Sequence, residues 1–122
     1  MRAYKRTDRI ASLVKDAMSE LLVFEVGDPR VHDAVVTHVH VTADLSIARV
    51  YVRSLVSNDQ AKTELMAGLE ASRGFLRSRL VSRVNLMRAP QLEFFYDEQE
   101  DQAARVDAIL DRLAHEKKDP PG

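Results

Sequence analysis

The sequence predicts a single α+β domain in which helices cover one face of a three-stranded sheet. Apolar residues recur at helical spacing near the start of the chain and again through its middle. β-Branched and aromatic residues gather in three short runs, and 122 residues fit one domain. The predicted order is helix, strand, strand, helix, helix, strand and a C-terminal helix. The apolar face of such a sheet needs a cover, which the helices supply.

The first helix is expected over residues 7–24, with Thr7 as its N-cap. Gly27 interrupts the helical pattern, and residues 28–30 (Asp-Pro-Arg) have the composition of a turn. The apolar residues that define the helix are Ile10, Leu13, Val14, Ala17, Leu21 and Leu22.

Two strands follow close together in the sequence, so we expect an antiparallel hairpin. The first covers residues 34–43, and its alternation predicts that Val35, Thr37, Val39 and Val41 share a face. In the second strand one face carries Ala48, Val50 and Val52. The opposite face of this strand carries Ile47, Arg49, Tyr51 and Arg53.

The second half of the chain predicts two more helical segments, a third strand and a last helix. Asn58 is among the candidate caps of a helix beginning near residue 60, and Gly74 is expected to mark a break within the long helical pattern. Residues 91–96 predict the third strand, and residues 99–117 the last helix. We expect one domain over residues 1–113 and a flexible tail over residues 114–122.

Composition excludes several classes of protein. The chain has no cysteine, so disulfides and thiolate metal sites are excluded, and no apolar run is long enough for a membrane helix. No signal peptide follows the basic start, which predicts a cytoplasmic protein. The net charge of −1 is unevenly distributed: residues 1–90 hold 14 Lys/Arg against 10 Asp/Glu, and residues 91–122 hold 4 against 9.

Catalytic and metal-binding signals are weak. His38 and His40 share a strand face and would give two metal ligands, or a metal-dependent nuclease site, but no third ligand is evident. A packing or solvent-facing pair is the favoured interpretation. The carboxylates of residues 97–98 and 100–101 are interpreted as a solvated helix start, and neither a nucleophile motif nor a phosphate-binding glycine loop is present.

Arginines form a more informative pattern. Five of them fall within 16 residues that contain no carboxylate, and arginine suits phosphate because its planar fork donates two hydrogen bonds. Composition alone leaves two alternatives equally open, phosphate binding or pairing with acids elsewhere. The five are Arg73, Arg77, Arg79, Arg83 and Arg88; a second cluster is Arg2, Lys5, Arg6 and Arg9, and a third is Arg49 and Arg53.

Taken together, several segments resemble the family of ribosome-binding factor A over residues 4–113. Each segment alone is weakly specific, whereas their order and spacing are specific. They are Arg9-Ile10, Glu20-Leu21-Leu22, Asp28-Pro29-Arg30, Val39-x-Val41-x-x-Asp44-Leu45, Ala48-x-Val50-Tyr51-Val52, Gly74-Phe75-Leu76-Arg77, Arg88-x-Pro90-x-Leu92-x-Phe94 and Tyr96-Asp97.

The resemblance implies a type II KH-like fold and a cytoplasmic, monomeric, cofactor-free factor that has no small-molecule substrate. It implies binding to the free 30S subunit and its 16S rRNA, a role in late maturation including 16S rRNA 5′-end processing, and growth in the cold. The family's helix–kink–helix, marked Ala-x-Gly, replaces the usual GXXG loop. Here that motif corresponds to Ser72-Arg73-Gly74, with Ser72 in place of Ala.

By the same resemblance, the arginine cluster over residues 73–88 and the basic cluster over residues 2–9 are the expected rRNA contacts. Asp28 and Pro29 are expected to be structural, while Arg30 pairs with a carboxylate or reaches RNA. A protein–protein adaptor without RNA contact is the alternative function. Exchanging Arg77 and Arg83 for Glu is expected to leave the fold intact and to weaken subunit binding.

Overall fold

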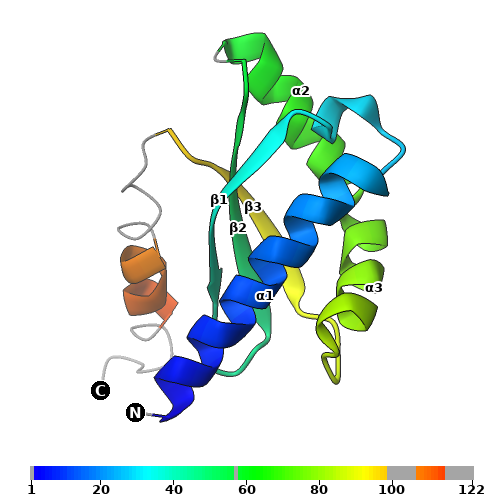
Figure 1. Ribbon diagram of the computed structural model, residues 1–122. Helices are drawn as coiled ribbons and strands as arrows, with labels where there is room; N and C mark the ends of the chain where they lie inside the picture. The colour runs from blue at the N-terminus through cyan, green and yellow to red at the C-terminus, as the bar shows by residue number, and fades with distance from the viewer. Residues whose placement is uncertain (1, 57, 99–106, 115–122) are drawn as a thin grey trace.

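The computed structural model describes residues 2–56, 58–98 and 107–114, with side chains from residue 6 onward. The elements follow the predicted order (Figure 1). They are α1 (Arg2–Phe24), η1 (Pro29–Val31), β1 (Ala34–Val41), β2 (Ile47–Ser54), α2 (Asp59–Ala71), α3 (Arg73–Val84) and β3 (Gln91–Tyr96), followed by helical residues 107–114.

The sheet has the strand order β1-β2-β3, so β2 is central. β1 and β2 are antiparallel, as a hairpin requires, and Val39 lies opposite Val50. β3 runs parallel to β2, with Val50 opposite Phe94. A parallel neighbour needs a long crossover connection, which α2 and α3 provide. The result is an α+β domain with a mixed sheet.

The helices α1, α2 and α3 pack on one face of this sheet and form the core with it (Figure 1). Leucine dominates the helical contribution because its unbranched Cβ suits the helix and its side chain fills the layer. Truncating any of these leucines to Ala is expected to cost about 2–5 kcal/mol. The fully buried ones are Leu21, Leu22, Leu65, Leu69, Leu76 and Leu80, and β3 adds Leu92.

A bulge changes the predicted pattern of β1. The register shifts between Val36 and His38, so Val36, Val39 and Val41 are buried in the core. The prediction that Val35 shares the core face of Val39 is therefore wrong, because the extra residue, Thr37, reverses the alternation before it.

The predicted start of the first helix is also wrong. α1 begins at Arg2, so Thr7 lies within the helix and is not its N-cap. Arg2, Ala3 and Lys5 are strong helix formers, so nothing in the sequence before Thr7 stops the helix. The N-cap of α2 is confirmed, since the Asn58 side chain accepts a hydrogen bond from the Ala61 amide at 2.7 Å.

The second face of the sheet is also covered. Residues 107–114 lie across the sheet from α1 and α3 (Figure 1). Tyr51, which points to this face from the central strand, is only 2% exposed. The rest of the predicted C-terminal helix and the tail lie outside the described residues. No helix within the described ranges is both long and apolar enough to cross a membrane.

Candidate nucleic-acid interface

Two α3 arginines contact groups close to them in the sequence. Arg73 forms an ion pair with Glu70, one helical turn earlier. Arg77 donates from Nε to the Pro90 carbonyl at 3.0 Å and from Nη2 to the Ala89 carbonyl at 3.1 Å. Arg77 is half-buried and joins α3 to the segment that enters β3. Its guanidinium therefore has a structural role.

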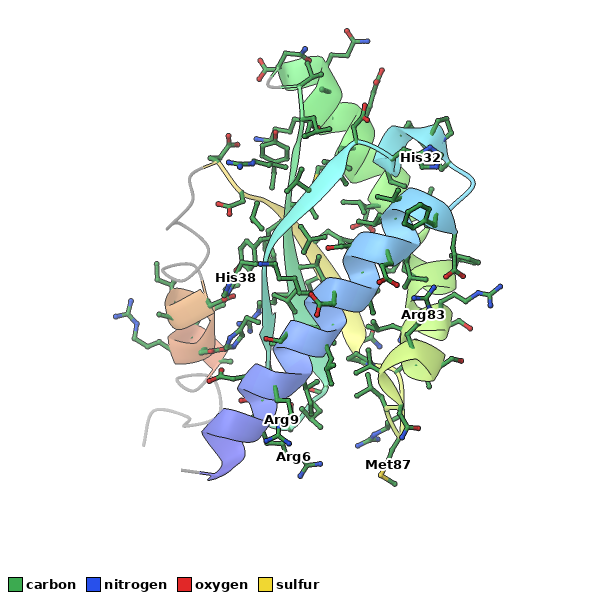
Figure 2. The ribbon with its side chains drawn as sticks, in the orientation of Figure 1. Arg6, Arg9, His32, His38, Arg83 and Met87 are labelled. Carbon is green, nitrogen blue, oxygen red and sulfur yellow. The ribbon has the colours of Figure 1, made fainter. Side chains whose placement is uncertain are left out.

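Arg83 faces the C-terminal end of α1 (Figure 2), and Arg79 lies near Glu25, which directly follows α1. Arg83 forms ion pairs with Glu20, at 2.7 Å, and with Glu25. The hydrogen bonds to Glu20 and Glu25 raise the pKa of Arg83. Arg79 is held less firmly: its Nε lies 4.0 Å from Glu25, its guanidinium lies over the Phe75 ring, and its side chain is 56% exposed.

A different set of arginines has no such partners. Arg6, Arg9 and Arg88 are exposed and make no hydrogen bond or ion pair within the described part of the chain. Arg6 and Arg9 lie at the N-terminal end of α1, and the fully exposed Met87, next to Arg88, lies at the same end of the molecule (Figure 2). We call Arg6, Arg9, Met87 and Arg88 the basic end.

The basic end suits an anionic partner. Its guanidinium groups are hydrated and uncompensated, so each can donate a bidentate pair of hydrogen bonds to phosphate. The positive end of the α1 dipole points the same way. Asp8, on the same turns, partly offsets this charge. The side chains of Arg2 and Lys5, also predicted to bind RNA, lie outside the described residues.

The break between α2 and α3 lies at Ser72, two residues before Gly74. The Ser72 amide donates to the carbonyls of Gly68 and Leu69, at 3.0 and 3.2 Å, and its side chain makes no capping hydrogen bond. Gly74 is exposed in the first turn of α3, and a Cβ added there would meet nothing within 4 Å. The glycine therefore leaves open space beside the break.

His38 and His40 face an acidic pair from the C-terminal segment (Figure 2). His38 Nε2 lies 2.9 Å from Asp107 Oδ2, and His40 Nε2 lies 3.0 Å from Asp111 Oδ2. These acids were not evident as candidate ligands in the sequence because Asp107 lies 69 positions beyond His38. Even so, the described residues contain no group of three side chains suited to hold a metal ion.

The same two acids hold Arg49 and Tyr51. Arg49 Nη1 donates to Asp111 at 2.9 Å, and the Tyr51 hydroxyl donates to Asp107 at 2.6 Å. Burial raises the pKa of Tyr51, as do the hydrogen bond to Asp107 and its charge. Burial is the largest single influence on the pKa of Arg49 and would lower it, but the hydrogen bond to Asp111 together with the charges of Asp111, Asp107 and Glu93 raises the pKa overall.

Of the two alternatives left open for the cluster of Arg49 and Arg53, the structure shows pairing with acids for Arg49, which is 4% exposed and paired with carboxylates. The signal that identifies its partners is helical spacing: Asp107 and Asp111 are four residues apart and share a helix face. The acidic face of this helix lies against the polar side chains of β1 and β2 that point to the second face of the sheet, such as His38 and Arg49.

The interpretation of Asp97 as part of a solvated helix start is wrong. Asp97 directly follows β3 and is 4% exposed. Its carboxylate accepts a hydrogen bond from the Thr37 hydroxyl at 2.6 Å, at the bulge of β1. Glu98, next to it, pairs with Lys62 of α2. Both carboxylates therefore tie the end of β3 to neighbouring elements.

Asp28 and Arg30 pair with each other beside η1. Asp28 accepts a hydrogen bond from the Arg30 amide at 3.0 Å, as an N-cap, and forms an ion pair with its guanidinium at 2.6 Å. The side-chain hydrogen bond from Arg30 holds the pKa of Asp28 at about 2, below its ordinary value of 3.8. The structure therefore pairs Arg30 with a carboxylate.

Comparisons with known proteins agree on one family. The family model described as "Ribosome-binding factor A" matches residues 6–110. A protein of that name from Roseiflexus sp. is 40% identical over 118 residues, covering 96% of this chain and 90% of that protein. One from Methylobacillus flagellatus is 40% identical over 121 residues, covering 98% of this chain and 94% of that protein.

Solved structures agree with the sequence comparisons. The crystal structure of ribosome-binding factor A from Thermus thermophilus superposes with a TM-score of 0.62 and 27% identity, over 74% of this chain and 94% of that one. A homology model of the T. thermophilus ribosome-binding factor A, fitted into a cryo-electron microscopy map of its complex with the 30S subunit, superposes with a TM-score of 0.56 and 28% identity, over 70% of this chain and 88% of that one.

Proposed function

The chain belongs to the family of ribosome-binding factor A, and we propose that it binds the free 30S small ribosomal subunit through 16S rRNA. The observation that carries the rRNA contact is the basic end. Its three arginines have no intramolecular partner within the described residues, whereas Arg77 and Arg83 are bound to other groups of the same chain. We propose that Arg6, Arg9 and Arg88 provide the main phosphate contacts.

The physical reason is the state of each guanidinium before binding. An arginine that binds phosphate releases the counterions condensed on the nucleic acid, which favours association. An unpaired arginine obtains this favourable free energy of binding without breaking an ion pair within the protein. Arg83 must first break its ion pairs with Glu20 and Glu25. Arg79, exposed and weakly paired, can join the contact. Arg73, Arg77 and Arg83, together with Arg2 and Lys5, remain predictions from the family resemblance.

The proposal extends to the finer role that the resemblance implies. We propose that binding assists late maturation of the subunit, including 16S rRNA 5′-end processing, and supports growth in the cold. The factor acts in the cytoplasm as a monomer, without cofactor or catalysis of its own. The break at Ser72, with open space at Gly74, supports an approach by RNA beside α3.

Co-sedimentation with purified 30S subunits across a salt series tests the basic end. Arg9→Gln combined with Arg88→Gln is expected to weaken binding roughly tenfold or more at low salt and to reduce the salt slope by about 1 for each phosphate that is no longer bound. The matched control is Lys15→Gln with Arg112→Gln, which removes the same charge from exposed positions elsewhere.

Equal weakening of binding by the Arg9/Arg88 variant and the Lys15/Arg112 variant would show that only net charge matters. It would overturn the placement of the rRNA contact at the basic end. Undiminished binding by the Arg9/Arg88 variant, at every salt concentration, would favour an adaptor that binds ribosomal protein. The exposed Phe24, at 81%, and Leu55, at 72%, are the side chains such an adaptor would use first.

A further inference from the structure

The covered second face of the sheet has the composition of an RNA-binding platform. Tyr51 of β2 and Phe95 of β3 are stacked, with ring centres 5.1 Å apart. His38 of β1 lies 5.5 Å from Tyr51, so three rings from three strands lie in a row. Arg49 and Arg53 alternate with Tyr51 on the same strand, and Arg53 is exposed at the rim.

Within residues 107–114, the hydrogen bonds that attach the cover to the sheet are made by carboxylates. Residues 107–114 contribute no side chain to the hydrophobic core cluster. Ile109 and Leu113 are 48% and 46% exposed and Leu110 is half-buried, so the apolar side chains of this segment are only partly covered. The attachment among the described residues runs through Asp107 and Asp111. Asp107 and Arg49 are buried, so removing the charge of the carboxylates leaves their partners uncompensated and is expected to loosen the contact.

The two carboxylates are anionic hydrogen-bond acceptors for donors on this face, the chemistry that a phosphate also offers. Asp111 accepts from Arg49, and Asp107 accepts from Tyr51 and lies beside His38. Arg49 is not fully satisfied by this arrangement, because its buried Nε has no hydrogen-bond partner among the described residues, although Glu93 lies 3.4 Å away.

We propose that this sheet face is a second nucleic-acid surface, specific for single-stranded RNA, which the acidic segment 107–114 occludes. Bases stack on aromatic side chains of a sheet, while arginines contact the backbone phosphates. A duplex cannot use the platform because its bases are already stacked. The surface is separate from the basic end and does not depend on binding to the 30S subunit.

The test measures binding of a labelled, unstructured RNA oligonucleotide by fluorescence anisotropy, and in parallel the chemical accessibility of the Tyr51 phenol. Asp107→Asn with Asp111→Asn keeps the shape of both side chains and removes their charge. We expect Tyr51 to become accessible and RNA affinity to rise roughly tenfold, the equivalent of about one stacked base. Asp111→Asn alone, at a half-exposed position, is expected to give a smaller rise in the same direction.

Two controls separate this surface from a general effect of charge. Asp16→Asn with Asp33→Asn removes the same charge from exposed positions and is expected to leave RNA affinity unchanged. Phe95→Ala, added to the Asp107/Asp111 variant, is expected to abolish the gain. Accessible Tyr51 without tighter RNA binding would overturn the proposal, as would a gain that survives Phe95→Ala. A Tyr51 that stays protected would overturn the claim that these carboxylates hold the cover.

Discussion

The arginines of α3 and those of the basic end are the same residue type in similar sequence surroundings, yet they differ in whether their guanidinium groups have partners in the structure. Arg77 and Arg83 donate to backbone carbonyls and to carboxylates. Arg9 and Arg88 have no partner within the described residues. The difference shows that a segment rich in arginine and free of carboxylates identifies positive charge. It does not identify which of these arginines are free to bind a partner.

The reason lies in distance along the chain. Glu20 and Glu25, which neutralise Arg83, are 63 and 58 positions away. No search for acids near α3 in the sequence finds them, because only the packing of α1 against α3 brings them into contact. Exchanging Arg77 and Arg83 together for Glu is therefore unsuited to test RNA binding, since both side chains also hold the fold.

Replacing Arg77 by Ala is expected to have the largest effect on stability. The change removes two hydrogen bonds from a charged, half-buried donor and leaves the carbonyls of Ala89 and Pro90 without it. Unfolding in urea should show a loss of about 1–3 kcal/mol in the free energy of unfolding. Arg88→Ala, the control from the basic end, should change it by less than about 0.5 kcal/mol. Equal losses in the free energy of unfolding for Arg77→Ala and Arg88→Ala would contradict the distinction between arginines with intramolecular partners and arginines without them.

Arg83→Ala is expected to have a smaller effect, which depends on salt. Its ion pairs with Glu20 and Glu25 lie at the surface, where water and salt screen them. The stability difference from the unmodified protein should therefore shrink as salt rises, whereas that of Arg77→Ala should persist. Thermal melts at low and high salt measure both. A salt-independent loss for Arg83→Ala would mean that packing of its methylene groups dominates.

Asp28→Asn extends the comparison to Arg30, another paired arginine, and is expected to have the smallest effect. The pKa of Asp28 is about 2 in the folded protein and 3.8 ordinarily, so folding favours the charged form. Its contribution is present above pH 3.8 and is lost as pH falls through about 2. Urea midpoints of the two proteins should differ at neutral pH and converge near the folded-state pKa. Asp16→Asn, at an exposed position of α1, should show no such convergence.

Local signals in the sequence determined most of the fold. Helical spacing of Leu65, Leu69, Leu76 and Leu80, all buried, located α2 and α3, and the side chain of Asn58 located the start of α2. β-Branched runs located β1 and β2, and aromatic residues located β3. These signals work because helix and strand periodicity and caps involve residues a few positions apart. The charge pattern likewise identified Arg6, Arg9 and Arg88 as candidates, but alongside arginines that the structure holds.

Only the tertiary structure decided which charges are available and which surfaces are covered. The bulge at Thr37 reversed the faces of β1, because it depends on contacts with Tyr51 and Asp97. Asp107 and Asp111 closed over the second sheet face, across 56 or more positions of sequence. Pairing of this kind depends on how two elements that are far apart in the sequence pack against each other. The composition of either element alone does not contain that information.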